Sequence, residues 1–196
     1  MQETKLEVVT PTLCYTLWGC DDCDWEFKPS DGSSGGILSL WHKSNSVKVN
    51  TFQGEGYVGV SLDWGVEKKR CVIVNVYSKC DLASKRRLWE HLLEERRNRG
   101  EEAWCVVGDF NVVCSRDERK GINEEISSSQ LLEMSLFNNF ISEVELDDMS
   151  VLGRRFTWYH PNGRSMSRID RVFISKEWFH MWGDNSLWVL PRDVSD

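Results

Sequence analysis

Two apolar runs separated by one amphipathic segment constrain the fold more than any other feature. The first run, "CVIVNV" (71–76), has no alternation of apolar and polar positions, so its strand needs cover on both faces. The second, "AWCVVG" (103–108), also reads as a buried strand. Between them apolar residues recur at helical spacing, with Asp81 as N-cap and Gly100 as the stop. The sequence therefore predicts a helix over 81–99 that joins and covers buried strands.

The rest of the chain continues this mixture of strands and helices. β-branched and aromatic runs between Gly, Ser, Asn and Asp predict strands at 35–42, 46–52, 56–64 and 70–78. Later segments predict a helix at 128–140, strands at 155–160 and 167–175, a short helix at 176–181 and a strand at 186–190. With 196 residues, 40% of them apolar, we expect a single α/β domain over 1–196, with sheets covered by helices.

Charge and apolar patterning exclude several classes of protein. A net charge of −7 argues against binding to polyanions through bulk charge, so any nucleic-acid contact must be local. The apolar runs are too short to span a membrane, and the N-terminus lacks the pattern of a secretory leader. We expect an intracellular protein that is neither secreted nor bound to membranes. The sequence gives no basis for inferring an obligate protein partner.

Polar side chains follow the apolar runs at a spacing that suits chemistry. Asp109 and Asn111 lie two residues apart after the run at 103–108, and residues two apart on a strand share a face. Asp170 interrupts another mostly apolar run, where a buried carboxylate needs a partner such as an Arg or a His. Tyr77 ends the first run. A polar turn after a core strand is the alternative interpretation of Asp109 and Asn111.

Several short motifs follow one another in a specific order along the whole chain. They are Q-E-T-K, N-V-Y, G-D-F-N, F-T-W, S-R-I-D-R and a terminal S-D, together with "GGILSLW", "LWEHL" and "FTWYHPNG". This ordered set resembles the endonuclease/exonuclease/phosphatase superfamily, most closely the apurinic-type endonuclease domain of plant non-LTR (LINE-type) retrotransposons. The resemblance implies a DNase I-like fold, a layered sandwich of two mainly antiparallel or mixed sheets flanked by helices.

The resemblance also implies roles for individual residues. Glu3 would hold a divalent cation, Mg²⁺ or alternatively Mn²⁺, and Asp196 would be the second carboxylate of the metal region. Asp109 would orient and deprotonate the attacking water, while Asn111 and Tyr77 would hydrogen-bond the scissile phosphate. The implied reaction is hydrolysis of a DNA phosphodiester that leaves a 3′-hydroxyl, which primes reverse transcription of the element. A DNA substrate implies a nuclear location.

The chain departs from the family pattern at both ends. Members begin with a strand that carries a W-N-x-R-G-like motif and end in S-D-H, whose histidine Asp170 would orient. This sequence starts at Met1, directly before Gln2 and Glu3, and stops at Asp196. We therefore expect a domain that lacks the first strand–helix–strand segment and the terminal histidine, with impaired activity.

A basic stretch near the end is the candidate for substrate contact. Five arginines fall between 154 and 171, where Asp170 is the only acid. We take Arg154, Arg155 and Arg168 as candidate phosphate contacts, and Trp158 as a residue that could stack on a base. Solvated arginines, and a tryptophan packed in the core, are the alternatives.

Two other functions stay open at this point. The chain could be a catalytically dead retroelement remnant that at most binds nucleic acid or a partner. It could also be a phosphatase of the same superfamily that acts on a phosphoinositide or another small phosphoester.

Overall fold

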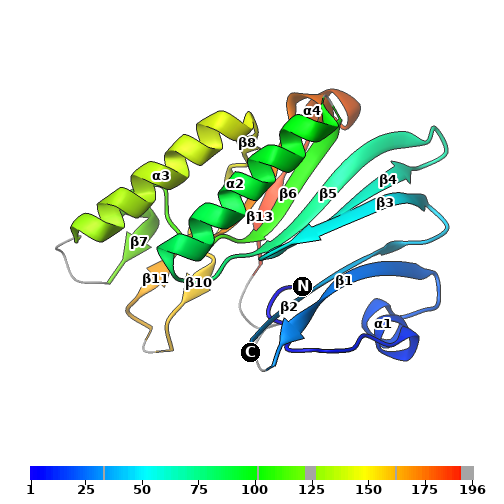
Figure 1. Cartoon of the computed structure of the whole chain (residues 1–196), viewed down its shortest axis with the longest axis horizontal. Coiled ribbons are helices and arrows are strands. Elements are labelled where there is room, and N and C mark those ends of the chain that lie inside the picture. Colours follow the sequence, from blue (N-terminus) through cyan, green and yellow to red (C-terminus); the bar gives the residue numbers. More distant parts are fainter. Residues whose placement is uncertain (33, 101, 122–126, 162, 191–196) are drawn as a thin grey trace.

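The computed structural model describes residues 1–32, 34–100, 102–121, 127–161 and 163–190 (Figure 1). Its helices are α1 (Pro11–Trp18), α2 (Leu82–Arg99), α3 (Ser128–Val144), α4 (Lys176–Met181) and the 3₁₀ turn η1 (Arg116–Glu118). Its strands are β1 (Cys23–Asp31), β2 (Ser34–His42), β3 (Ser46–Gly54), β4 (Tyr57–Trp64), β5 (Lys69–Tyr77), β6 (Ala103–Asp109), β7 (Arg119–Lys120), β8 (Asp147–Asp148), β9 (Val151–Gly153), β10 (Trp158–Tyr159), β11 (Met166–Ser167), β12 (Asp170–Ile174) and β13 (Leu187–Val189). In the described part of the chain, no helix combines the length and the apolar character needed to cross a membrane.

A six-stranded sheet in the order β3-β4-β5-β6-β12-β8 forms the centre of the molecule. β5 and β6 are parallel and joined through α2, whereas the other neighbours pair antiparallel. Helices α2 and α3 cover one face of this sheet (Figure 1). The core between them contains Val74, Leu88, Trp104, Phe137 and Phe173, all with exposed fractions of 3% or less. The expected burial of the run at 71–76 is thereby confirmed.

The opposite face of the sheet carries a layer made of two separate strand pairs. The hairpin β1–β2 packs there through Trp41, which lies in a core cluster with Val60 and Leu62. The parallel pair β9–β13 lies farther along the same face, where Leu187 and Val189 line a cavity together with residues of β6 and β12. A layered α/β fold with several sheets flanked by helices is therefore confirmed. The second layer differs from a single continuous sheet, because it is divided into these two pairs.

Local sequence explains most of the element boundaries, including those of two elements that were not predicted. α1 begins after Thr10, whose hydroxyl accepts a hydrogen bond from the Leu13 amide, and Pro11 supplies the first helical residue. β1 begins with strict alternation of apolar and charged residues over 23–28, the period of a strand, and it pairs with β2 along most of its length. The strand expected at 155–160 is reduced to β10, which belongs to a small three-stranded sheet outside the core.

Candidate active site

Strand register brings three predicted site residues into one row. β5 ends at Tyr77, β6 ends at Asp109, and β12 begins at Asp170. In the sheet Tyr77 pairs with Asp109, and Asp109 pairs with Asp170 on its other side. Directly paired residues on neighbouring strands have Cα atoms about 5 Å apart. Tyr77 and Asp109 are 32 positions apart in sequence, and Asp109 and Asp170 are 61 positions apart. The three residues nevertheless lie side by side at the same end of three adjacent strands.

Asn111 is held against Asp109 by the turn that follows β6. Its backbone is in the left-handed region, with φ of 51°, a conformation that asparagine tolerates better than most residues. Its amide N–H donates to Oδ1 of Asp109 at 2.7 Å, and its side-chain Nδ2 donates to Oδ2 at 3.2 Å. The same Nδ2 donates to the carbonyl of Ser78 at 2.7 Å. The two side chains thus form one hydrogen-bonded unit at the end of the strand.

Lys85 on α2 holds this unit in place, a role that was not predicted from the sequence. Its side chain is 3% exposed, and Nζ donates to the carbonyl oxygen of Asn111 at 2.6 Å and pairs with Glu133 at 2.6 Å. A lysine within a helix that is rich in Lys, Arg and Glu reads as a solvated residue. Only the packing of α2 against α3 reveals that Lys85 is buried beneath the site.

The environment of Asp109 favours its protonated form. Burial, followed by the nearby Asp170 carboxylate, raises the pKa of Asp109 to about 7, and Glu3 acts in the same direction. The amide of Asn111 and the ammonium of Lys85 oppose this shift. A carboxylate whose pKa lies near neutrality can accept a proton from water and release it again. Asp109 therefore has the properties of a general base.

Asp170 is supported by Thr157, from the F-T-W motif. The Thr157 hydroxyl oxygen accepts the N–H groups of Ile169 and Asp170, each at 3.1 Å, and the hydroxyl is hydrogen-bonded to the Asp170 carboxylate. Burial raises the pKa of Asp170, and the bond to Thr157 opposes that rise. The partner expected for this carboxylate was an Arg or a His, and the structure gives it a hydroxyl instead. Thr157 was missed as a site residue although its motif was noted.

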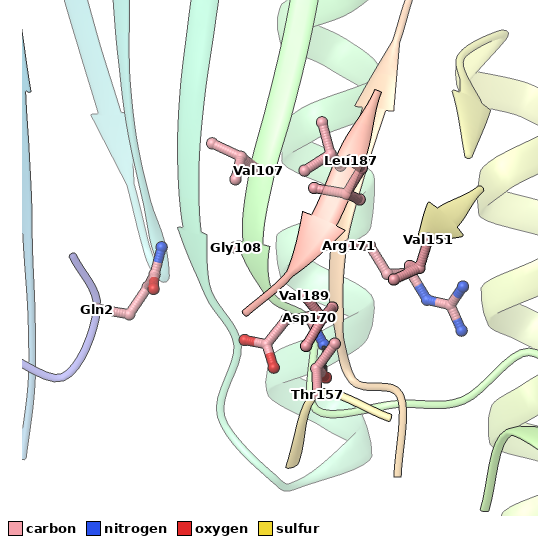
Figure 2. A pocket seen from close by; sticks show the side chains of 10 residues that line it. Gln2, Val107, Gly108, Val151, Thr157, Asp170, Arg171, Leu187 and Val189 are labelled. Carbon is pink, nitrogen blue, oxygen red and sulfur yellow. Dashed lines mark hydrogen bonds between the residues drawn. The ribbon is translucent and has the colours of Figure 1, made fainter. Parts of the chain in front are cut away.

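Asp170 and Thr157 also line a cavity of about 210 Å³ between the two strand pairs of the second layer. Figure 2 shows the Asp170 carboxylate pointing toward the side on which Gln2 lies, beneath the end of β13. The remaining lining is mostly apolar and comes from β6, β9, β12 and β13. The start of β12, which carries Asp170, is therefore accessible from this cavity.

The N-terminal segment brings Glu3 to the other side of the row. The Tyr77 hydroxyl is hydrogen-bonded to Glu3, and burial, then Glu3 and Asp109, raise the pKa of Tyr77 to about 12. Gln2 donates to the buried Asn75 Oδ1 at 2.5 Å, and Asn75 donates to the Leu38 carbonyl at 3.2 Å. Asn75 is the one polar residue within "CVIVNV", which was the available signal for this anchoring role.

The oxygen-rich edge fits a hard divalent cation. Glu3 is an exposed carboxylate beside Tyr77, and its charge contributes to the raised pKa of Asp109, so acidic oxygens converge there. Within the described residues, neither carboxylate forms an ion pair with a lysine or an arginine. Asp196, the other expected metal carboxylate, lies outside the described residues. A second acidic group, formed by Cys114, Glu118 and Asp148, has ligand atoms within 4.8 Å of one another. Its carboxylates are ion-paired with arginines, so this group does not suit a cation.

The residues proposed for substrate contact are in different surroundings. Arg154 is exposed, and Arg155 is exposed and ion-paired with Asp117. The Arg168 side chain is only 15% exposed and is ion-paired with two carboxylates. Trp158 is 38% exposed and lies edge-on to His160, so its expected place in the core was wrong. The first two arginines and Trp158 are thus accessible to a ligand.

Several solved structures share this fold at low sequence identity. An AP endonuclease from Leishmania major matches with a TM-score of 0.63 at 15% identity, covering 90% of this chain and 68% of that one. The endonuclease domain of TRAS1, a telomere-specific non-LTR retrotransposon, matches with a TM-score of 0.61 at 14% identity, covering 89% and 82%. The human Nocturnin catalytic domain matches with a TM-score of 0.53 at 14% identity, covering 83% and 64%.

The chain spans only part of some of these structures, such as 59% of a beta toxin from Staphylococcus aureus. A search of curated proteins found no match. The sequence model of the endonuclease/exonuclease/phosphatase family, in contrast, matches residues 1–196. The chain therefore belongs to the endonuclease/exonuclease/phosphatase family, whose members are hydrolases of the nuclease and phosphoesterase type.

Proposed function

We propose that this chain is a Mg²⁺-dependent DNA endonuclease domain that nicks target DNA for a LINE-type retrotransposon. The observation that carries the proposal is the row of Tyr77, Asp109 and Asp170 on three adjacent strands, with Asn111 bonded to its centre. Such a row combines a base of nearly neutral pKa with neutral hydrogen-bond donors. Hydrolysis of a phosphodiester requires both of these functions at one position.

Each residue has a defined part in this proposal. Asp109 orients the attacking water and accepts its proton at a carboxylate oxygen. Tyr77 donates its phenolic hydrogen to the scissile phosphate and must release Glu3 to do so. Asn111 has both amide hydrogens engaged by Ser78 and Asp109, so phosphate binding exchanges its 3.2 Å bond to Asp109 for one to the substrate. That exchange frees a carboxylate oxygen of Asp109 for the water.

Members of the family generally use a divalent metal ion, and Glu3 is the residue that would hold it, with Asp196 as the second carboxylate. A bound Mg²⁺ neutralises charge that develops on the phosphate oxygens. Asp170 keeps its proposed role of orienting a histidine, and Thr157 holds its carboxylate in place.

DNA is the proposed substrate because local features compensate for the acidic chain. Arg154, Arg155 and Trp158 are exposed and lie within five consecutive residues, and Trp158 could offer an aromatic face to a base. The similarity of the fold to the TRAS1 endonuclease domain and to an AP endonuclease supports this choice. An enzyme with this substrate would act in the nucleus.

A supercoiled-plasmid nicking assay with Mg²⁺ tests the proposal. It compares residues 1–196, the same chain with a histidine added after Asp196, and each of these with Asp109→Asn. We expect relaxed circles that depend on Mg²⁺ and on Asp109, with more product when the histidine is present. EDTA should abolish the product.

Two outcomes would replace the proposal. If neither form nicks although circular dichroism shows it folded, the remnant interpretation is correct for this chain. If soluble phosphoesters are hydrolysed and plasmid DNA is not, the chain is a phosphatase of the family.

A further inference from the structure

A closed ring of two arginines and two carboxylates lies beside the site. Arg168 Nη1 contacts Glu118 Oε1 at 3.1 Å, and its Nη2 contacts Asp148 Oδ1 at 2.8 Å. Arg171 Nη1 contacts Asp148 Oδ2 at 2.5 Å, and its Nη2 contacts Glu118 Oε2. Each guanidinium therefore binds both acids, and each acid binds both guanidinia. We call these four residues the ion-pair ring.

The ring is largely buried and electrically balanced. The side chain of Arg171 has no exposed surface, and its guanidinium carbon lies 5.6 Å from the centre of the Phe137 ring. Glu118 Oε2 also accepts the Cys114 amide at 2.7 Å, and Arg168 Nη2 also donates to the Met149 carbonyl at 3.0 Å. The two positive and two negative charges of the ring balance one another.

The ring joins three segments around the start of β12. Glu118 comes from η1, Asp148 from β8, and the two arginines lie on either side of Ile169 and Asp170. The Arg168 amide donates to the Glu118 carbonyl at 2.9 Å, and the Phe110 amide donates to the Ile169 carbonyl at 3.0 Å. Figure 2 shows the side chains of Asp170 and Arg171 leaving the strand on different sides. The start of β12 thus directs the Asp170 carboxylate toward the site and the Arg171 guanidinium toward the ion-pair ring.

We propose that Arg168 and Arg171 are positioning residues, and that the ion-pair ring fixes the register in which Asp170 lies beside Asp109. β12 pairs with β6 over five residues, and a slip by one residue would turn Asp170 to the opposite face. Apolar side chains lie on both faces of β12, with Phe173 in the core beneath the helices and Val172 in the cavity on the other side, so a slip by one residue would still leave apolar side chains on both faces. Two guanidinium groups that each bind two carboxylates do distinguish these registers, because a shifted strand would leave buried charges unpaired.

This inference assigns Arg168 a role different from phosphate binding. A guanidinium that binds DNA phosphate contributes about one unit to the slope of binding against salt concentration. The guanidinium of Arg168 is already bound by two carboxylates and a carbonyl, within a side chain that is 15% exposed. A positioning role predicts that the salt slope stays unchanged when Arg168 is replaced.

Amide hydrogen exchange tests the inference without any need for activity. The variant Arg168→Lys keeps the charge and loses the planar fork. The control Arg99→Lys changes an ion pair of similar burial, Arg99 with Glu95 on α2. We expect exchange at Phe110 and along the β6–β12 ladder to accelerate at least about tenfold more than along the β4–β5 ladder. The control should show no such local difference.

Should Arg168→Lys fail to fold, the double variant Glu118→Gln with Arg168→Gln replaces it. That variant removes one charge of each sign and leaves Arg171 paired with Asp148. Uniform acceleration over both ladders, in whichever variant folds, would overturn the inference, because the ring would then contribute only to global stability.

Kinetics give a second measurement, which rests on the proposed function. In the nicking assay we expect Arg168→Lys to lower kcat about tenfold while KM and the salt slope of DNA binding stay as in the parent chain. A raised KM with a shallower salt slope would show that Arg168 binds phosphate and would overturn the inference. If no form of the chain nicks DNA, the proposed function fails, whereas the exchange result on the ring still stands or falls by itself.

Discussion

Two pairs of acids, Asp109 with Asp170 and Glu118 with Asp148, lie within a few residues of β12 and have opposite surroundings. Glu118 and Asp148 are enclosed by two arginines that match their charge. Asp109 and Asp170 face each other across a strand pair, supported by amides and a hydroxyl, and burial raises the pKa of both. The fold therefore contains one satisfied and one unsatisfied acidic group.

This difference indicates which carboxylates of the fold remain available for a reaction. A carboxylate that binds arginine has lone pairs and charge already engaged, so it is less available to a metal ion, although burial still raises the pKa of Asp148 against the opposing effect of Arg171 and Arg168. A buried carboxylate without such a partner lowers the stability of the folded chain but remains available to water and to cations. The ion-pair ring orders the segments around β12, and the row of Tyr77, Asp109 and Asp170 provides the reactive groups. Substitutions that exchange these properties provide the tests below.

The largest expected effect is on catalysis. Asp109→Asn removes the base, and we expect the nicking rate to fall by roughly 100- to 10,000-fold, the range typical of general base catalysis. Glu118→Gln, in the ring, should lower the rate only about tenfold, because it acts through the register of β12. Initial rates on supercoiled plasmid measure both. Equal losses of nicking rate in the two variants would show that the row and the ion-pair ring do not differ in their contribution to catalysis.

Breaking the ring should have the largest effect on stability. Arg171→Met leaves two buried carboxylates with one arginine, which typically costs about 3–5 kcal/mol in the free energy of unfolding. Urea titration followed by tryptophan fluorescence measures this quantity. Arg155→Met, which alters an exposed ion pair with Asp117, is the control and should leave the urea midpoint unchanged. A stable Arg171→Met variant would mean that the ring is dispensable.

The row should behave in the opposite way, with a defined dependence on pH. The folded chain holds a proton on Asp109 up to about pH 7, whereas the unfolded chain releases it near pH 4, so ionisation lowers stability as pH rises between these values. In EDTA, Asp109→Asn should therefore stabilise the chain at pH 8 by on the order of 2–4 kcal/mol. The gain should vanish below about pH 4. Thermal unfolding at several pH values checks the sign.

The smallest effect concerns Thr157. Thr157→Val keeps the shape but removes a hydroxyl that serves two amides and the Asp170 carboxylate. We expect a loss of about 1–3 kcal/mol in stability and a further rise in the pKa of Asp170. Urea titration and carboxyl NMR measure the two quantities. An unchanged pKa would show that the hydroxyl does not support this acid.

The sequence predicted the elements that follow simple periodicities. The continuous apolar runs of β5 and β6, and the capped helix between them, were recognisable because each is fixed by local pattern. Asp109 and Asn111 were identified as a pair from the rule that residues two apart on a strand share a face, but β6 ends at Asp109, and the turn that follows brings Asn111 back to it by hydrogen bonds. β1 was missed although residues 23–28 alternate between apolar and charged, which is the pattern of a half-buried strand.

The site residues that escaped prediction all owe their roles to distant partners. Lys85 looks like any solvent-facing lysine of α2 until α3 and the turn at Asn111 enclose it. Arg168 looked like a phosphate ligand because its neighbours in sequence are basic, whereas its contacts come from residues 50 and 20 positions away. Charge in the sequence does not reveal which charges neutralise one another in space.

Carbon-13 NMR titration of the Asp109 carboxyl, in metal-free solution, examines the reactive row at its centre. The account predicts a pKa of about 7, and a lower pKa in Asp170→Asn, because the neighbouring negative charge is then gone. Adding Mg²⁺ should lower the pKa in the parent chain and less so in Glu3→Gln. A pKa near the ordinary value of about 4, unmoved by either change, would contradict the account.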